Sequence, residues 1–231
     1  MTRVAVTTTR DSAPRVSAAL AAKGLEPVEL PCIRIEVSPE DRLQRLRSAA
    51  ADADLILLTS RRPVAILWDG SMPATPVAAV GSATADAVRD AGGTVHFTGT
   101  GAATELLPFL MQQASERRVV FPHAGALDKS ITEAIARVAT DLVAEPAYAA
   151  VPIGPDPNPP TRAVLFGSPS AVEGWTMTRT LDGLVVGAIG TTTAAALEEL
   201  GHPPAVMPAR PGFEALVTAL ADHLSHPGGT E

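Results

Sequence analysis

The chain has 231 residues, enough for one large α/β domain or two small ones. Acidic residues outnumber basic ones by 25 to 18, and this net charge of −7 argues against nucleic acid or a membrane as a partner, since both attract clustered positive charge. The single cysteine, Cys32, excludes an internal disulfide, and no Cys/His spacing predicts a metal site. No apolar run approaches a membrane span and no signal-peptide pattern opens the chain, which predicts a soluble, cytoplasmic protein.

Short apolar runs alternate with amphipathic stretches along the chain, which is typical of βα units on a parallel sheet. Gly24, Gly92 and Gly201 each follow a helical window, where a residue with left-handed backbone commonly ends a helix. The predicted strands are 4–8, 55–58, 77–80, 119–121, 163–166 and 184–189. The predicted helices are 11–23, 84–91, 105–113, 131–138, 193–200 and 213–224.

Part of this alternation repeats within the chain. Residues 77–92 (VAAVGSATADAVRDAG) align without gaps on residues 186–201 (VGAIGTTTAAALEELG), with seven of 16 positions identical. Two such matches at nearly constant offset predict an internal duplication of one α/β half. The alternative is that all βαβ units resemble one another. The other matched pairs are 55–64 with 163–172 and, more weakly, 6–31 with 120–146.

Two strand-like segments stand apart from the alternation. Residues 31–37 (PCIRIEV) and 146–153 (PAYAAVPI) both begin with proline and fall at equivalent places in the two copies. Proline is disfavoured in the interior of a sheet because it lacks the N–H donor. We therefore expect both segments to connect two domains rather than to lie inside a sheet.

The chemistry of the chain is carried by turns rather than by a familiar cofactor motif. There is no G-x-G-x-x-G after the first strand, no phosphate-binding loop, no H-E-x-x-H and no G-x-S-x-G. Instead, hydroxyl residues recur where a strand gives way to a helix. Five turns have this form: Thr7-Thr8-Thr9-Arg10, Thr59-Ser60-Arg61-Arg62, Gly81-Ser82-Ala83-Thr84, Gly167-Ser168-Pro169-Ser170 and Gly190-Thr191-Thr192-Thr193.

Such turns line the crevice at the carboxyl ends of parallel strands, where ligands bind, and helix N-termini there favour anions. Plain N-capping by Ser and Thr is the competing interpretation of any one turn. Five turns of this kind in two copies favour an anionic ligand held in a cleft.

With these motifs in this order, the chain resembles the uroporphyrinogen-III synthase family. The resemblance rests on LLTSRRPV, AAVGSATADAVRDAG, AVLFGSPSAVEGW and AIGTTTAAALEELG, together with the N-terminal TTTR and the only tyrosine. It implies two similar flavodoxin-like α/β/α domains with parallel sheets, joined by a two-stranded β-ladder. On that pattern, residues 1–32 and 151–231 form one discontinuous domain and residues 33–150 form the other.

The resemblance also implies a cofactor-free lyase that acts as a monomer. Its substrate, hydroxymethylbilane, is a linear tetrapyrrole with an acetate and a propionate on each ring. The substrate loses its terminal hydroxyl and closes to uroporphyrinogen III, and ring D is inverted through a spiro intermediate. Unassisted closure gives the symmetric type I isomer instead. The protein must therefore position the two chain ends and assist the departure of water by general acid catalysis.

Tyr148 matches the family tyrosine that is the usual candidate for the proton donor; its alternative role is that of an amphipathic ladder residue. Thr84 and Thr193 are alternatively pure N-caps. Arg61 and its neighbour Arg62 both stand where they can pair with carboxylates, although one of them is expected at the solvated surface. The predicted substrate-binding residues are Arg10, Ser60, Arg61, Thr84, Ser168, Ser170, Thr192 and Thr193.

One segment departs from the family pattern. Many members carry an Arg-Gly turn after the strand that opens the second copy, whereas this chain has Phe121-Pro122-His123-Ala124-Gly125. Either His123 or Lys129 replaces that charge, or the contact is absent. The departure leaves two alternatives open: a non-catalytic or regulatory member of the family, and a binding protein for another polycarboxylate metabolite.

Overall fold

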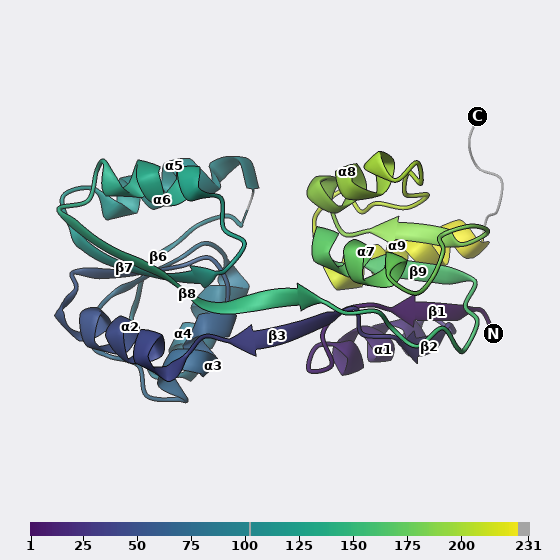
Figure 1. Ribbon diagram of the computed structural model, residues 1–231, viewed down its shortest axis with the longest axis horizontal. Helices are drawn as coiled ribbons and strands as arrows, with labels where there is room; N and C mark the ends of the chain where they lie inside the picture. The colour runs from purple at the N-terminus through teal and green to yellow at the C-terminus, as the bar shows by residue number, and fades with distance from the viewer. Residues whose placement is uncertain (102, 226–231) are drawn as a thin grey trace. The chain divides into compact units, whose positions relative to one another are not determined.

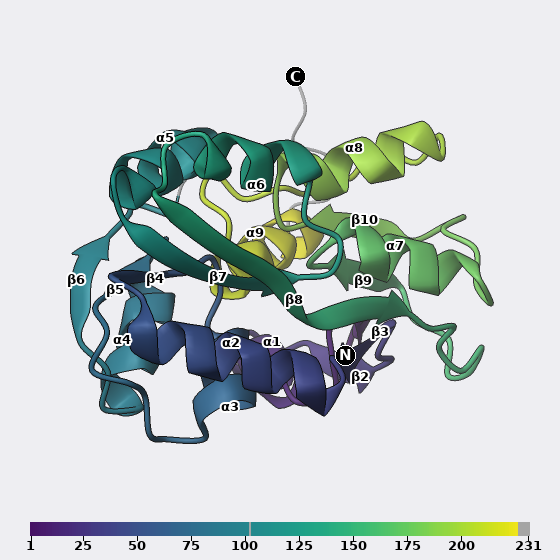
Figure 2. The same cartoon turned by 60° about the vertical axis from the view of Figure 1, so that its left-hand side comes forward.

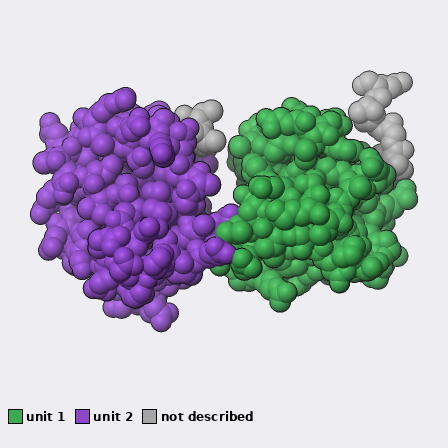
Figure 3. Space-filling model, viewed as in Figure 1, with its two compact units in different colours: residues 1–35, 151–231 green, residues 36–150 purple. Residues whose placement is uncertain are grey.

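The computed structural model describes residues 1–101 and 103–225 (Figure 1). It divides into two compact units, which Figure 3 colours separately. Unit 1 combines Met1–Ile35 with Val151–Glu231, and unit 2 is Glu36–Ala150. Both divisions fall inside strands, β3 (Ile33–Val37) and β8 (Asp141–Pro152), so the chain passes between the units through these two strands.

Unit 1 contains a four-stranded parallel sheet in the order β10-β9-β1-β2. Alternate residues of β9 point to opposite faces of this sheet. Leu165 packs in the cluster formed with α1 and α9, whereas Phe166 contacts Trp175 of α7 with ring centroids 6.0 Å apart. The strands are β1 (Arg3–Val6), β2 (Glu26–Glu29), β9 (Ala163–Phe166) and β10 (Val185–Ala188). The helices are α1 (Ala13–Ala22), α7 (Pro169–Thr176), α8 (Thr191–Glu199) and α9 (Phe213–Ser225).

The sheet of unit 2 has the order β3-β8-β7-β4-β5-β6, and β8 to β6 are parallel. Helices α5 and α6 cover one face, where Leu110 and Ile135 pack on Leu57 and Phe121, and α2, α3 and α4 lie on the other (Figure 2). The remaining strands are β4 (Leu55–Leu58), β5 (Val77–Ala79), β6 (Val95–Thr98) and β7 (Arg118–Ala124). The helices are α2 (Glu40–Asp52), α3 (Arg62–Trp68), α4 (Ser82–Asp90), α5 (Ala103–Ala114) and α6 (Lys129–Ala136).

The repeated segments form the same local structure in both units. Helices α4 and α8 begin and end at the same offset of 109 residues, and β4 and β9 correspond residue for residue at an offset of 108. Strand order β8-β7-β4-β5 in unit 2 parallels β2-β1-β9-β10 in unit 1. The predicted mixed α/β architecture with parallel sheets is confirmed.

The three predicted glycine helix ends are also confirmed. Gly24, Gly92 and Gly201 have φ of +73°, +77° and +77°, a region that only glycine enters without a steric cost. At each of them two backbone hydrogen bonds close the helix, as in Gly24 N–H to Ala21 O and Leu25 N–H to Leu20 O. Among the described residues, no helix is both long and apolar enough to cross a membrane.

Residues 146–153 contain the division between the two units, as expected of a connecting segment, but the expectation that they lie outside a sheet is wrong for residues 146–148. Residues 146–152 form the second half of β8, which begins at Asp141 and lies between β3 and β7. Pro146 is in register with His123 of β7, and its carbonyl accepts a hydrogen bond from Ser38 Oγ at 2.7 Å. The first predicted segment, residues 31–37, contains β3, which is the edge strand of this sheet. β3 lies beside β8 and runs in the opposite direction to it (Figure 1).

Candidate active site

Tyr148 lies where β8 leaves its pairing with β7, and its side chain is 8% exposed. Its backbone carbonyl accepts a hydrogen bond from Gly125 N–H at 2.7 Å. Its hydroxyl oxygen is 3.2 Å from Oγ of Ser60, directly after β4, and the guanidinium carbon of Arg62 is 5.7 Å from the ring centroid. Within unit 2, the fold therefore places Tyr148 in contact with the turn Thr59-Ser60-Arg61-Arg62, one of the five predicted turns with hydroxyl residues.

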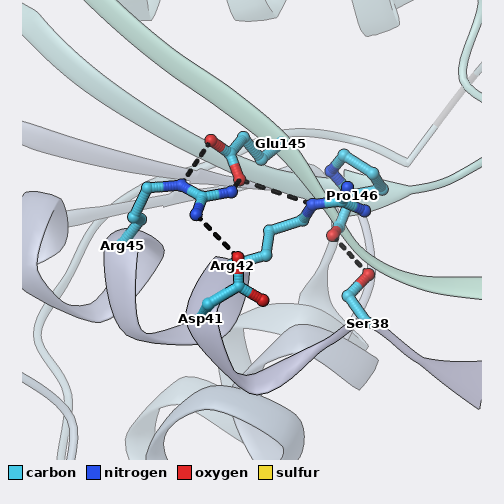
Figure 4. A network of polar contacts seen from close by, with 6 residues as sticks. All are labelled: Ser38, Asp41, Arg42, Arg45, Glu145 and Pro146. Atoms are coloured by element: carbon cyan, nitrogen blue, oxygen red, sulfur yellow. Dashed lines mark hydrogen bonds and ion pairs between the residues drawn. The ribbon is translucent and has the colours of Figure 1, made fainter.

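Hydrogen bonds and ion pairs hold the part of β8 just before Tyr148 (Figure 4). They come from Ser38, which follows β3, and from residues of α2. Ser38 donates twice, from Oγ to Pro146 O at 2.7 Å and from its backbone N–H to Ala147 O at 3.0 Å. Arg45 makes a two-point contact with Glu145 at 3.2 and 3.1 Å and also bonds Asp41, which holds the pKa of Asp41 below its ordinary value.

Ser38→Ala is expected to lower the free energy of unfolding by about 1 kcal/mol, because the Pro146 carbonyl loses its half-buried donor. The more exposed ion pairs of Arg45 contribute less, since water screens them. Urea unfolding measures the change, with Ser130→Ala, at an exposed position of α6, as the control. If Ser38→Ala unfolds at the same urea concentration as that control, the hydrogen bond does not secure β8.

The N-capping interpretation holds at only one of the predicted turns. Ser168 is the N-cap of α7 and its Oγ accepts a hydrogen bond from Ala171 N–H at 3.3 Å. The N-caps of α4 and α8 are Gly81 and Gly190, so capping by Thr84 and Thr193 is wrong. Both threonines lie at the third helical position instead.

The predicted binding residues fall into one set in each unit and differ in exposure. In unit 2, Arg61 is exposed, Ser60 is half-buried and Thr84 is 7% exposed. Thr193 is only 2% exposed, so both threonines are buried and have little surface for a ligand. The unit 1 set comprises exposed Arg10 and Thr192, half-buried Ser168 and Ser170, and buried Thr193.

Thr9 belongs to the predicted turn Thr7-Thr8-Thr9-Arg10 but was not among the predicted binding residues. Its side chain is 5% exposed, and its Oγ1 has no hydrogen-bond partner within the part of the chain that the structure describes. Neighbouring Thr7 donates to Leu165 O at 2.6 Å and so joins β1 to β9. Part of the TTTR turn therefore has a structural role.

The family model HEM4, described as "Uroporphyrinogen-III synthase HemD", matches residues 14–218. The chain belongs to the uroporphyrinogen-III synthase family. A comparison with curated proteins found no match.

Solved structures of uroporphyrinogen III synthases share the fold of this family member. A mutant enzyme from Thermus thermophilus is 19% identical, with a TM-score of 0.64 over 97% of this chain and 99% of that chain. An enzyme from Helicobacter pylori is 17% identical, with a TM-score of 0.66 over 96% of this chain and 99% of that chain. At these identities the likeness establishes the fold.

The segment that departs from the uroporphyrinogen-III synthase pattern is partly buried. His123 is 9% exposed, and its Nδ1 lies 2.7 Å from Ala124 O. Its ring also packs beside Phe121, with centroids 5.4 Å apart. Lys129 is exposed at the start of α6. Of the two candidates for the missing arginine, only Lys129 has an exposed side chain.

Cys32 is the one thiol of this family member and is fully buried. Burial raises the pKa of the Cys32 thiol to about 12, despite the opposing charge of Arg179. A thiol that keeps its proton at neutral pH is a poor nucleophile. Among the described residues, no group of three His, Cys, Asp or Glu side chains is placed to hold a metal ion.

Proposed function

We propose that this protein converts hydroxymethylbilane into uroporphyrinogen III and water. The observation that carries the proposal is the family match, which spans residues 14–218 and so includes every strand of both sheets except β1. The reaction belongs to the lyases, because the substrate loses water as it closes. Its product feeds the biosynthesis of haem and related tetrapyrroles.

The reaction begins when the bond between the terminal methylene carbon and its hydroxyl breaks. The electron pair leaves with oxygen, which takes up one proton and departs as water. The remaining cation is stabilised by the lone pair of the pyrrole nitrogen. The carbon of ring D that already carries the bridge to ring C attacks this cation and forms the spiro intermediate. That bridge bond then breaks, and its electron pair restores ring D and leaves a methylene cation on ring C. The unsubstituted carbon of ring D attacks this second cation and loses one proton, so the inverted macrocycle and one water account for every atom of the substrate.

Tyr148 is the proposed donor of the first proton. A phenol carries its proton at neutral pH and can release it to a developing hydroxide. The proton lost at ring closure restores the phenol. This role is supported by the position of Tyr148 beside Ser60, one of the hydroxyl groups at the carboxyl ends of the strands.

Of the predicted binding residues, the proposed substrate contacts are Arg10, Ser60, Arg61, Ser168, Ser170 and Thr192. A substrate with eight carboxylates, two on each of its four rings, needs several cationic and hydrogen-bonding partners. The exposed guanidinium groups of Arg10 and Arg61 support direct carboxylate contacts. Thr84 and Thr193 are buried, so we propose that they pack the first turns of α4 and α8 against the rest of their units rather than contact the substrate.

The deciding experiment incubates the protein with freshly prepared hydroxymethylbilane and separates the type I and type III isomers. Predominant type III product supports the proposal. Type I product at the rate of the buffer control, with tight binding of the tetrapyrrole, indicates a non-catalytic family member. If the tetrapyrrole does not bind, the protein serves another polycarboxylate.

We also propose that the enzyme is monomeric and acts in the cytoplasm. Both are what membership of this family implies. Sedimentation equilibrium with and without the tetrapyrrole measures the mass directly. A dimer at assay concentration contradicts the first part of this proposal.

Thr192→Val is expected to raise KM about five- to tenfold, because it deletes one exposed hydrogen-bonding group at the start of α8. Stability should change by less than about 0.5 kcal/mol, as for other exposed substitutions. Steady-state kinetics and thermal unfolding measure the two effects. Thr176→Val, at the exposed last residue of α7, is the matched control, and an equal KM for the two variants excludes Thr192 from binding.

A further inference from the structure

The geometry points to Arg62 as a positioning residue for Tyr148: its guanidinium holds the phenol ring and stabilises the negative charge left when the hydroxyl releases its proton. This inference rests on the proposed function, in which Tyr148 is the acid. Arg62 itself gives up no proton in this role. It acts on the reaction only through the tyrosine.

The contact has the geometry of a cation–π interaction. The guanidinium carbon lies 5.7 Å from the centroid of the Tyr148 ring, within the distance of about 6 Å at which such contacts are significant. Tyr148 is 8% exposed and Arg62 is half-buried, so both groups are partly shielded from solvent. Burial strengthens the attraction because it lowers the local dielectric.

The local fold explains why Arg62, rather than Arg61, takes this position. Arg61 is the N-cap of α3 and is exposed, whereas Arg62 is the first residue of the helix. Pro63 and Val64 are buried immediately afterwards and anchor this first turn in unit 2. Neighbouring Ser60 approaches the tyrosine hydroxyl from the same segment.

The attraction grows as the tyrosine ionises. A neutral phenol offers the cation only the negative face of its ring, but a phenolate carries a full negative charge. The Ser60 hydroxyl, 3.2 Å away, can then donate to the charged oxygen, and a charge-assisted hydrogen bond is stronger than a neutral one. Both contacts are therefore stronger after proton release than before it, as catalysis requires.

Two other ionisable groups near Tyr148, on β8 and β7, have polar partners of their own. Glu145, three residues earlier on β8, bonds Arg45 and lies 3.6 Å from Nε of Arg42. His123 on β7 has its Nδ1 at 2.7 Å from the Ala124 carbonyl. Among the described residues, Arg62 is the cation found over the Tyr148 ring.

The first test needs no substrate. Tyr148 is the only tyrosine, so the ultraviolet absorbance of tyrosinate reports its ionisation alone. In Arg62→Met, the alkaline transition should move to higher pH by about half a unit, and Arg62→Lys should fall between this variant and wild type. Arg89→Met, at an exposed position of α4, is the control, and circular dichroism at each pH shows whether the fold persists. An unchanged transition in folded Arg62→Met overturns the inference.

The second test separates positioning from substrate binding. Arg62→Met should lower kcat about tenfold with KM changed less than about twofold, and Arg62→Lys should recover part of kcat. In a Tyr148→Phe background, Arg62→Met should have almost no further effect. A rise in KM alone, or a full tenfold loss in the Tyr148→Phe background, overturns the inference because Arg62 then acts on the substrate.

The two tests also separate this inference from the proposed function. If wild-type protein forms no type III isomer, the proposed function fails, and the absorbance titration still decides whether Arg62 stabilises ionised Tyr148. If wild type is active and Arg62→Met retains both the transition and kcat, the proposed function stands and the role of Arg62 is wrong.

Discussion

Tyr148→Phe is expected to reduce formation of the type III isomer by about 100-fold or more, because the leaving hydroxyl loses its proton donor. The substitution keeps the buried ring and the packing of β8 against β7, and it deletes only the oxygen that lies 3.2 Å from Ser60. Spontaneous type I product should rise in place of type III. Isomer-resolved kinetics measure both products in one assay.

Ser60→Ala provides the comparison for this experiment, since it removes the hydrogen-bond partner of the tyrosine but leaves the phenol in place. We expect a loss of about tenfold or less, the usual size of one hydrogen bond. A rate within about twofold of wild type for Tyr148→Phe would mean that the tyrosine is structural. Water or another hydroxyl would then supply the proton.

Gly174→Ala is expected to destabilise unit 1 by about 3 kcal/mol, at the upper end of the usual cost of overpacking. A β-carbon at Gly174 of α7 would lie 2.3 Å from Cys32 O and 2.7 Å from Ile153 O. Neither oxygen moves easily, because Cys32 O accepts the backbone hydrogen bond of Ile153 N–H at 2.9 Å. The clash outweighs the gain of about 1 kcal/mol from the better helix propensity of alanine.

Thermal and urea unfolding of Gly174→Ala measure this cost. The control is Gly212→Ala, where an added β-carbon meets no atom within 4 Å and the change should stay below about 1 kcal/mol. Equal stability of the two variants would show that α7 can move away from the two backbone segments. Cys32 immediately precedes β3 and Ile153 immediately follows β8, so this contact fixes where β3 begins and where β8 ends.

Much of the fold was predictable because it depends on local patterns. The strands at 55–58 and 163–166 are continuous apolar runs with both faces buried, and the structure has them at those residues. Elements with weaker patterns were not predicted. Short strands β2 (Glu26–Glu29) and β6 (Val95–Thr98) lie at sheet edges and are only partly buried, so their sequences lack a continuous apolar run.

The candidate site was predictable only in part. The turn motifs pointed to Ser60 and to the unit 1 hydroxyl residues, but they could not distinguish exposed Thr192 from buried Thr193, one residue further along α8. Exposure depends on which side of the helix meets the sheet. The sequence likewise could not show that the N-caps of α4 and α8 are Gly81 and Gly190 rather than one of the hydroxyl residues that follow them.

The amino-acid sequence by itself determined the alternation of strands and helices, the repeat at an offset of about 109 residues and the glycines that end three helices. Each depends on neighbouring residues, through burial patterns and backbone sterics. Only the tertiary structure decided that Pro146 lies inside a sheet and that Tyr148 meets Ser60 and Arg62, which are 88 and 86 positions earlier in the chain. These contacts depend on strand order, because β7 lies between β8 and β4 and their carboxyl ends meet at one edge.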